Sequence, residues 1–188
     1  DPMADGPLIQ ESSEIAIKKG MNINKCFSLV KKIRQKDKNI PIILMGYYNP
    51  IHYYGKKKFI NNALETGVDG LIIVDLPIEE DDELFFEAEK NNLNFIRLVT
   101  PTTNVKRLKL ITKNAKGFIY YVSVAGITGT KSASIEDVEN KINVIKNITN
   151  LPVIVGFGIK TPNQAFEMSK ISDGIVVGSA LVEKIKET

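Results

Sequence analysis

The sequence has little of what several classes of protein require. Its 188 residues include one cysteine, Cys26, and one histidine, His52. A single cysteine excludes a disulfide within the chain, and with one histidine far away, a Cys-His nucleophile pair or a zinc site has little material. Cys26 lies in KCFSLVKKI, where an apolar helix face explains it better than chemistry. We assign His52, in NPIHYYG, to the surface or a loop.

Long apolar runs and a strong net charge are missing as well. Uncharged stretches such as GFIYYVSVAGITGT are shorter than the roughly 18 apolar residues of a membrane span. No signal peptide is visible, so we expect a cytoplasmic protein without a membrane segment. The 25 Lys and Arg against 22 Asp and Glu give a net charge of +3 without a basic stripe, which gives no indication of nucleic-acid binding.

What is present is an ordinary globular composition with a repeated strand pattern. Hydrophobic residues make up 43% of the chain and charged residues 25%, and we expect one domain over residues 1–188. Short runs rich in Val and Ile indicate strands of a parallel sheet covered on both faces, because their apolar character is nearly continuous. The six runs are IPIILMGY (40–47), DGLIIVDL (69–76), NFIRLVT (94–100), GFIYYVSV (117–124), LPVIVGFG (151–158) and DGIVVGSA (173–180).

Segments with the apolar spacing of helices lie between the strands, and two more precede the first strand at about 8–19 and 23–36. This alternation requires right-handed crossovers and fits either an open doubly wound sheet or a (β/α)₈ TIM barrel. Eight βα units typically occupy about 250 residues. The chain therefore fits a barrel truncated to about six βα units, namely units 3 to 8 plus the helix of unit 2. DPMADGP would then be the loop after the second barrel strand.

Glycine-rich loops follow the last three strands, at the edge where parallel α/β folds carry their function. These loops are SVAGITGT, GFGIKTP and VVGSALV. Glycine lets backbone N–H groups approach a ligand, and a helix beginning there adds its positive end, so the loops favour a phosphate. Alternatively, the glycines only form tight turns. The phosphate-binding candidates are Gly158, Gly178 and Ser179, with Gly129 reaching in from the preceding loop.

Acidic and aromatic residues near the same strand ends are further candidates. The position of Asp5 in DPMADGP would direct its carboxylate to the same mouth, whereas Asp75, at a strand end, could equally fix a loop. The acids at 79–83 fit a helix N-terminus, which favours negative charge. Aromatic residues at strand ends either belong to the core or together wall an apolar, planar substrate. They are Tyr47, Tyr48, Tyr120 and Phe157.

Five motifs taken together resemble the alpha subunit family of tryptophan synthase: DPMADGPLIQ, MGYYNPI, SVAGITGT, GFGIKTP and GIVVGSALV. The resemblance covers essentially all 188 residues. The first motif and AGITG are specific, whereas GFGI and GSA are shared with other phosphate-binding barrels. The resemblance implies a TIM barrel and a lyase that cleaves indole-3-glycerol phosphate to indole and glyceraldehyde 3-phosphate by a retro-aldol reaction in tryptophan biosynthesis. It implies no metal or organic cofactor in this subunit.

The resemblance also implies residue roles. Asp5 matches a catalytic Asp that serves the indole nitrogen. The companion Glu belongs to the strand before this loop and is not in the sequence, so we expect a fragment, lacking the N-terminal strands and the C-terminal end, that is inactive alone. Gly129, Gly158, Gly178 and Ser179 match the phosphate-binding groups. The residues matching the active-site wall or mobile lid are Tyr120, Thr128, Tyr47 and Phe157.

The family pairs with a beta subunit that carries pyridoxal phosphate, in an α2β2 tetramer. The residues matching its contact face are Asp1, Pro2, Asn49 and Pro77. Two alternatives stay open. One is a different phosphate-binding TIM-barrel enzyme, against which the ADGP loop argues. The other is a non-catalytic, alpha-like activator of a beta subunit.

Overall fold

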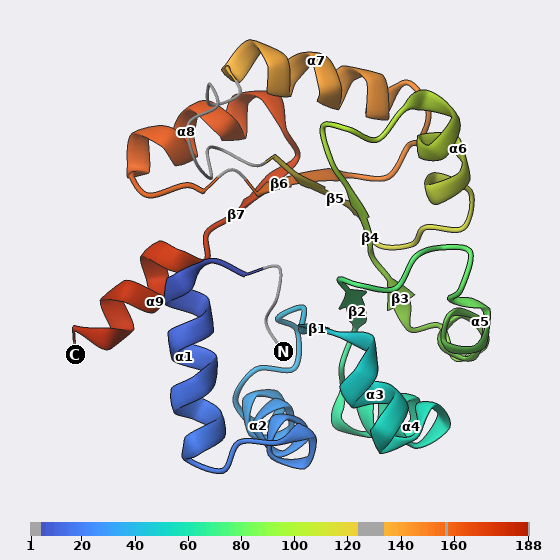
Figure 1. The fold of residues 1–188 in the computed structure, drawn as a ribbon, viewed down its shortest axis with the longest axis vertical. Coiled ribbons are helices and arrows are strands. Elements are labelled where there is room, and N and C mark those ends of the chain that lie inside the picture. Colours follow the sequence, from blue (N-terminus) through green and yellow to red (C-terminus); the bar gives the residue numbers. More distant parts are fainter. Residues whose placement is uncertain (1–4, 124–133, 157, 188) are drawn as a thin grey trace. The chain divides into compact units, whose positions relative to one another are not determined.

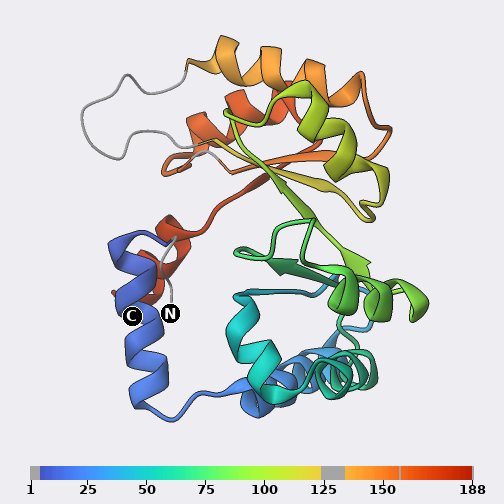
Figure 2. The same cartoon turned by 45° about the vertical axis from the view of Figure 1, so that its right-hand side comes forward.

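The structure of the chain, a computed structural model, describes residues 5–123, 134–156 and 158–187. It divides into two compact parts, the N-terminal half Asp1–Phe95 and the C-terminal half Ile96–Thr188. Each half contains a parallel sheet with helices packed on it (Figures 1 and 2). The single domain over residues 1–188 stays a prediction. Within the described ranges, no helix is long and apolar enough to cross a membrane.

The N-terminal half begins with two helices and continues with alternating strands and helices. Its strand β2 lies between β1 and β3, and both pairings are parallel. The elements are α1 (Pro7–Lys18), α2 (Ile23–Lys36), β1 (Ile43–Gly46), α3 (Tyr48–Tyr54), α4 (Lys56–Thr66), β2 (Gly70–Ile73), α5 (Asp82–Lys90) and β3 (Asn94–Phe95).

The core of this half forms where apolar helix faces meet β2. Every residue of β2 is buried, as its nearly continuous apolar sequence predicts for a strand covered on both sides. Phe27 of α2, Phe59 of α4 and Phe85 of α5 are buried in the same cluster. The rings of Phe27 and Phe59 lie 5.3 Å apart between centroids, in tilted contact. The helices therefore hold β1 and β2 in fixed register, with their carboxyl ends side by side.

The C-terminal half is a four-stranded parallel sheet in the order β4-β5-β6-β7, which is also the chain order. Figure 1 shows α6, α7 and α8 along one side of this sheet. The elements are β4 (Arg97–Val99), α6 (Val105–Lys113), β5 (Ile119–Val122), α7 (Ile135–Lys146), β6 (Val153–Gly156), α8 (Pro162–Ile171), β7 (Gly174–Val176) and α9 (Ser179–Lys186).

The two faces of this second sheet differ in burial. Ile119, Tyr121, Val153 and Val155 are buried against the helices, whereas the intervening residues of β5 and β6 are only half-buried. The sequence predicted strands covered on both faces, whereas β5 and β6 are fully buried on one face only. The residues on the less buried face are Leu98, Tyr120, Val122, Ile154 and Gly156, which the strand register places side by side.

The six expected strands and the helices are present, with two local differences. The run 94–100 forms two short strands, β3 and β4, which belong to different sheets. Helix α3 was not predicted, because Asn49-Pro50 indicates a turn in the sequence. Pro50 lies in the first turn of α3, where a missing N–H costs no hydrogen bond within the helix. His52 is exposed on this helix, in agreement with the surface role expected from the sequence.

One arrangement of an Asp and a basic residue occurs in both halves, just before the strand that follows a helix. Asp69 exchanges hydrogen bonds with the backbone of Ile42: its N–H donates to the Ile42 carbonyl over 2.8 Å, and its carboxylate accepts the Ile42 N–H over 2.7 Å. Arg34 of α2 pairs with the same carboxylate. Each such contact ties the start of one strand to the start of its neighbour and thereby fixes the register.

The matching contact in the C-terminal half involves Asp173, before β7. Its N–H donates to the Val153 carbonyl over 3.0 Å, and its carboxylate accepts the Val153 N–H over 2.8 Å. Lys146 of α7 pairs with it at 2.9 Å. The Val153 N–H, followed by Lys146, lowers the pKa of Asp173, because both stabilise the ionised carboxylate.

Candidate functional site

In the N-terminal half, the structure brings Asp5 and Tyr47 together although they are 42 positions apart in the sequence. The Tyr47 hydroxyl donates a hydrogen bond to Asp5 Oδ2 over 3.2 Å, and both residues are half-buried. Asp5 directly precedes Gly6, the N-cap residue of α1. Tyr47 follows β1 and is the N-cap residue of α3. A carboxylate thus lies beside a phenol close to the carboxyl end of β1.

The loops after β1 and β2 support this pair and expose two predicted partner residues. Asp75, after β2, accepts the Tyr48 N–H over 2.7 Å at the beginning of α3. Of the two readings of Asp75, the structure therefore favours the one in which it fixes a loop. Asn49 and Pro77 are both exposed near these strand ends. Their exposure is compatible with the predicted partner interface, which stays a prediction.

The acids at 79–83 lie at the beginning of α5, as expected for a helix N-terminus. Asp81 is the N-cap residue and α5 begins at Asp82. Acidic side chains are favoured there because the N-terminus carries a partial positive charge.

In the C-terminal half, Tyr120 lies on the less buried face of the sheet, over the neighbouring strand. A Cβ atom on Gly156 would stand 2.6 Å from the Tyr120 hydroxyl oxygen and 2.8 Å from its Cε2. Only a residue without a side chain therefore allows this position of the Tyr120 ring. Sequence reasoning missed Gly156. The signal that would have found it is the strand register, since a glycine on the same face as a tyrosine marks a close approach.

The predicted phosphate-binding residues lie at two strand ends of this half. Gly158, in the loop after β6, has φ +61°, a left-handed conformation that glycine adopts without strain. Gly178 is the N-cap residue of α9 and Ser179 is its first residue, and both are exposed. No atom of the described residues lies within 4 Å of a Cβ built on Gly158 or Gly178. Their surroundings thus leave space beside the backbone at both positions.

The N-terminus of α9 differs from those of the other helices in the same half. Asn104, Ser134 and Thr161 cap α6, α7 and α8 by accepting a backbone N–H with their side chains. Among the residues that the structure describes, no side chain caps α9. The first N–H groups of a helix have no acceptor within the helix, and they combine with the helix dipole to bind anions. This end of α9 is therefore chemically suited to a phosphate.

Five predicted site residues lie outside the described residues: Asp1, Pro2, Thr128, Gly129 and Phe157. Their roles stay predictions. Among the described residues, the structure joins Asp5 to Tyr47 by a hydrogen bond and places Gly178 and Ser179 together at the N-terminus of α9.

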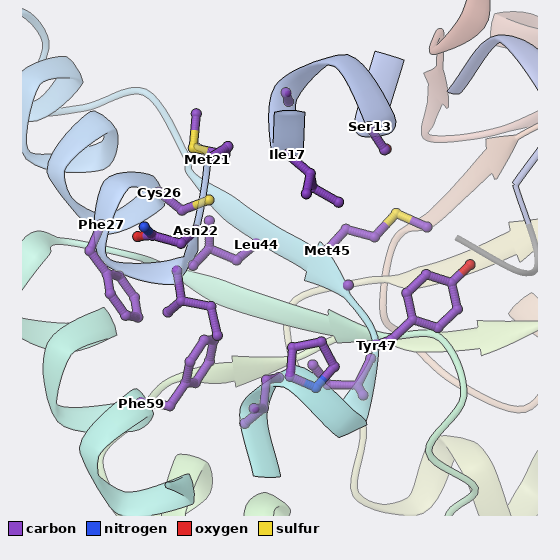
Figure 3. Close-up of a pocket in the computed structure, with 16 residues that line it drawn as sticks. Ser13, Ile17, Met21, Asn22, Cys26, Phe27, Leu44, Met45, Tyr47 and Phe59 are labelled. Carbon is purple, nitrogen blue, oxygen red and sulfur yellow. The ribbon is translucent and has the colours of Figure 1, made fainter. Parts of the chain in front are cut away.

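A pocket of about 370 Å³ opens in the N-terminal half between α1, α2, β1 and α3 (Figure 3). Its walls are mostly apolar and include Leu44, Phe27 and Met45, with Tyr47 at one end. Burial raises the pKa of the Cys26 thiol, which also lines this pocket. A raised pKa keeps the thiol protonated at neutral pH, in agreement with a packing role rather than a nucleophilic one.

Each half offers one kind of chemistry. In the N-terminal half, the Asp5 carboxylate next to the Tyr47 phenol suits acid–base chemistry. In the C-terminal half, the N-terminus of α9 suits an anion. No group of three or more His, Cys, Asp or Glu residues that could hold a metal ion occurs in the part of the chain that the structure describes.

Comparison with known proteins gives one consistent result. The family model described as tryptophan synthase alpha chain matches residues 1–188. The chain is similar to the tryptophan synthase alpha subunit of Legionella pneumophila str. Paris, with 40% identity and a TM-score of 0.91 over 100% of this chain and 69% of that one. It is similar to the alpha subunit from Campylobacter jejuni, with 39% identity and a TM-score of 0.90 over 100% of this chain and 75% of that one.

A third similar structure is that of the tryptophan synthase a2b2 complex from Pyrococcus furiosus. The identity is 37% and the TM-score 0.89, covering 100% of this chain and 75% of that one. These matches confirm the expected fold class, α/β with the βα units of a TIM barrel, over the part of those chains that 188 residues span.

Proposed function

This chain belongs to the tryptophan synthase alpha chain family, a lyase family of tryptophan biosynthesis, and from that premise we propose that Asp5 is its acid–base residue for cleaving indole-3-glycerol phosphate. The observation that carries the proposal is the half-buried carboxylate of Asp5, held by the Tyr47 hydroxyl near the end of a parallel strand. Catalytic groups of parallel α/β folds lie at that end.

The reaction breaks the carbon–carbon bond between indole C3 and the glycerol chain. The chain hydroxyl on the carbon attached to C3 loses its proton and becomes the aldehyde of glyceraldehyde 3-phosphate. C3 takes up a proton before the bond breaks, which places a positive charge on the ring. Asp5 accepts the hydrogen bond of the indole N–H and relieves this charge by taking the N–H proton, and it returns the proton to nitrogen as the electron pair of the broken bond comes back to the ring.

The C-terminal half supplies the groups proposed to hold the substrate phosphate. Gly158, Gly178 and the Ser179 hydroxyl and N–H would bind the phosphate at the uncapped N-terminus of α9, as described above. Tyr120 would contact the substrate from the less buried face of the sheet. The same proposal includes Gly129, Thr128 and Phe157, on the family resemblance alone. No cofactor is assigned to this chain.

The proposed partner is a tryptophan synthase beta subunit carrying pyridoxal phosphate, in an α2β2 assembly like the a2b2 complex of the Pyrococcus furiosus relative. Asn49 and Pro77, both exposed, are proposed contact residues, together with Asp1 and Pro2. We also propose that residues 1–188 alone release no indole, because the glutamate that the family resemblance places before Asp1 is not among them.

The test compares Asp5→Asn with Ser179→Ala in the full gene product together with a beta subunit, following indole release from indole-3-glycerol phosphate. Asp5→Asn should lower kcat by about a hundredfold or more, the scale of one acid–base group. Ser179→Ala should mainly raise KM, because it removes a phosphate contact that does not change during the reaction. Unchanged indole release by Asp5→Asn would contradict the role of Asp5 and favour the non-catalytic activator.

A further inference from the structure

The position of Tyr47, whose hydroxyl contacts Asp5, is fixed by hydrogen bonds of the backbone on both sides of it. Gly46, the residue before Tyr47, is the last residue of β1, and its carbonyl accepts the Val74 N–H over 2.9 Å. Tyr48, the residue after it, donates its N–H to Asp75 over 2.7 Å. The backbone on both sides of Tyr47 is therefore tied to residues that follow β2. Figure 3 shows the Tyr47 ring at the end of β1, its hydroxyl directed away from Cys26 and Phe27.

Asp5 itself lies outside any helix or strand and is held at two points. Its backbone carbonyl accepts the Gln10 side-chain amide of α1 over 2.9 Å. Its Oδ2 atom accepts the Tyr47 hydroxyl over 3.2 Å. The first contact fixes the main chain. The second acts on the carboxylate, whose rotation about the terminal torsion is otherwise broad.

We propose that Tyr47 is the positioning residue for Asp5: its hydroxyl holds Oδ2, so that the carboxylate presents Oδ1 to the indole N–H. This inference rests on the proposed function of Asp5. A carboxylate offers two oxygens and about four acceptor directions, and a fixed donor on one oxygen selects among them. Tyr47 would thereby orient the Asp5 carboxylate in addition to forming part of the wall around the substrate.

The physical argument concerns geometry rather than binding strength. Effective acid–base catalysis needs the accepting oxygen within hydrogen-bond reach of the proton at the moment of reaction. The backbone on both sides of Tyr47 is held by hydrogen bonds, so its hydroxyl is a donor in a fixed place. This donor removes orientations of the Asp5 carboxylate that do not lead to reaction. The contribution should therefore appear in kcat, while KM for the substrate stays nearly constant.

The experiment compares Tyr47→Phe with Tyr53→Phe in the full gene product with a beta subunit. Both variants remove one phenol oxygen from neighbouring positions at or in α3, but Tyr53 is 93% exposed. Tyr47→Phe should lower kcat by about tenfold, equivalent to about 1.4 kcal/mol in the barrier, with KM changed by less than about twofold. Tyr53→Phe should leave both constants unchanged. An unchanged kcat for Tyr47→Phe, or an equal loss for Tyr53→Phe, overturns the proposal.

A double-mutant cycle with Asp5→Glu separates positioning from a general packing effect. The longer side chain moves the carboxylate away from the Tyr47 hydroxyl, so Tyr47→Phe should cost less than about twofold in kcat on that background. A loss equal to the one in the native background overturns the proposal.

The cycle of Tyr47→Phe and Asp5→Glu can also be measured on the midpoint of urea unfolding, which does not depend on activity. If the shift of the double variant differs from the sum of the two single shifts, the contact is supported; if it equals the sum, the proposal is overturned. If no variant, including the native protein, releases indole, the proposed function fails, and the unfolding cycle alone still decides whether Tyr47 holds Asp5.

Discussion

Two glycines on the less buried face of the C-terminal sheet make room for larger neighbours. Gly156 accommodates the Tyr120 ring, and a Cβ on Gly174 would stand 2.7 Å from Cδ1 of Ile154. Since real Cβ atoms essentially never make contacts shorter than 3.0 Å, any side chain at either position forces its neighbour to move. The position of the proposed substrate-contacting Tyr120 is thus set by a residue that has no functional group of its own.

Gly156→Ala should destabilise the protein by about 1–3 kcal/mol, the usual cost of overpacking, because the new methyl group displaces the Tyr120 ring. Urea unfolding would measure this. Gly46→Ala is the matched control, since Gly46 also ends a strand and no atom in the described part of the chain lies within 4 Å of its Cβ position. Removing the ring by Tyr120→Ala should abolish most of the extra cost of Gly156→Ala. An equal cost with and without the ring would contradict the steric explanation.

At the scale of single residues, the sequence motifs predicted which residues belong to the site, but not which of them are in contact. Asp5 and Tyr47 both belong to motifs quoted from the sequence, yet their hydrogen bond joins positions 42 apart and depends on where α1 begins and β1 ends. Gly156 was missed because its requirement comes from a side chain on another strand. Such requirements become visible only once the register is known.

At the scale of the elements, the contacts of Asp69 and Asp173 hold neighbouring strands in register. Each carboxylate accepts a backbone N–H at the start of the preceding strand and pairs with a basic residue of the helix that comes before that strand. Gly67 adds to the first of these, because a Cβ there would stand 2.9 Å from Nε of Arg34. A register error of one residue would turn every side chain of a strand to the other face.

Asp173→Ala should lower the free energy of unfolding by about 1–2 kcal/mol at pH 7, since the Val153 N–H loses its charged acceptor. The side chains of Asp173 and Lys146 are 40% and 39% exposed, so screening by water keeps the ion pair's own share small. The pKa of Asp173 is lowered in the folded state, so its contribution is present above about pH 4 and is lost as the pH falls through the folded pKa.

Unfolding measured between about pH 7 and pH 3 should therefore show a difference between native protein and Asp173→Ala that narrows at acid pH. The control is Glu167→Ala, which removes an exposed pair with Lys170 on α8 and should cost only a few tenths of a kcal/mol. A difference that stays constant to the acid end would mean that the charge of Asp173 does not contribute.

The apolar patterns of the sequence predicted the type of most helices and strands, but they predicted less well where these begin and end. Each of the six Val- and Ile-rich runs contains a strand, and the run 94–100 contains two. The pattern gave no sign that residues 94–100 divide between two sheets, because the apolar run continues across Ile96. Helix α3 was hidden by Pro50, whose place in a first helical turn cannot be distinguished from a loop by composition.

For the whole molecule, the important feature is that each sheet has strands with one partner. Within the described residues, β1 pairs only with β2, and β7 pairs only with β6. Met45 of β1 is 54% exposed. Unpaired strand edges beside apolar surface are templates for pairing with another chain.

Residues 1–188 expressed by themselves should therefore associate or remain loosely packed. Sedimentation velocity over a range of concentrations would show species larger than one chain, and thermal unfolding should be broad. A monomer that unfolds in one sharp, cooperative transition would contradict this expectation. The same sample should release no indole, which an indole assay run in parallel would check.

The Asp69 and Asp173 contacts span only 27 and 20 positions of the chain. Each is encoded within a single stretch of the gene, together with the two strands that it joins. A duplicated or recombined βα segment of this kind would contain both the Asp and the backbone N–H that it binds. The contact between its strands would therefore form without a matching change elsewhere in the protein that receives the segment. Such self-contained segments are what evolution by gene duplication and exchange can move most easily.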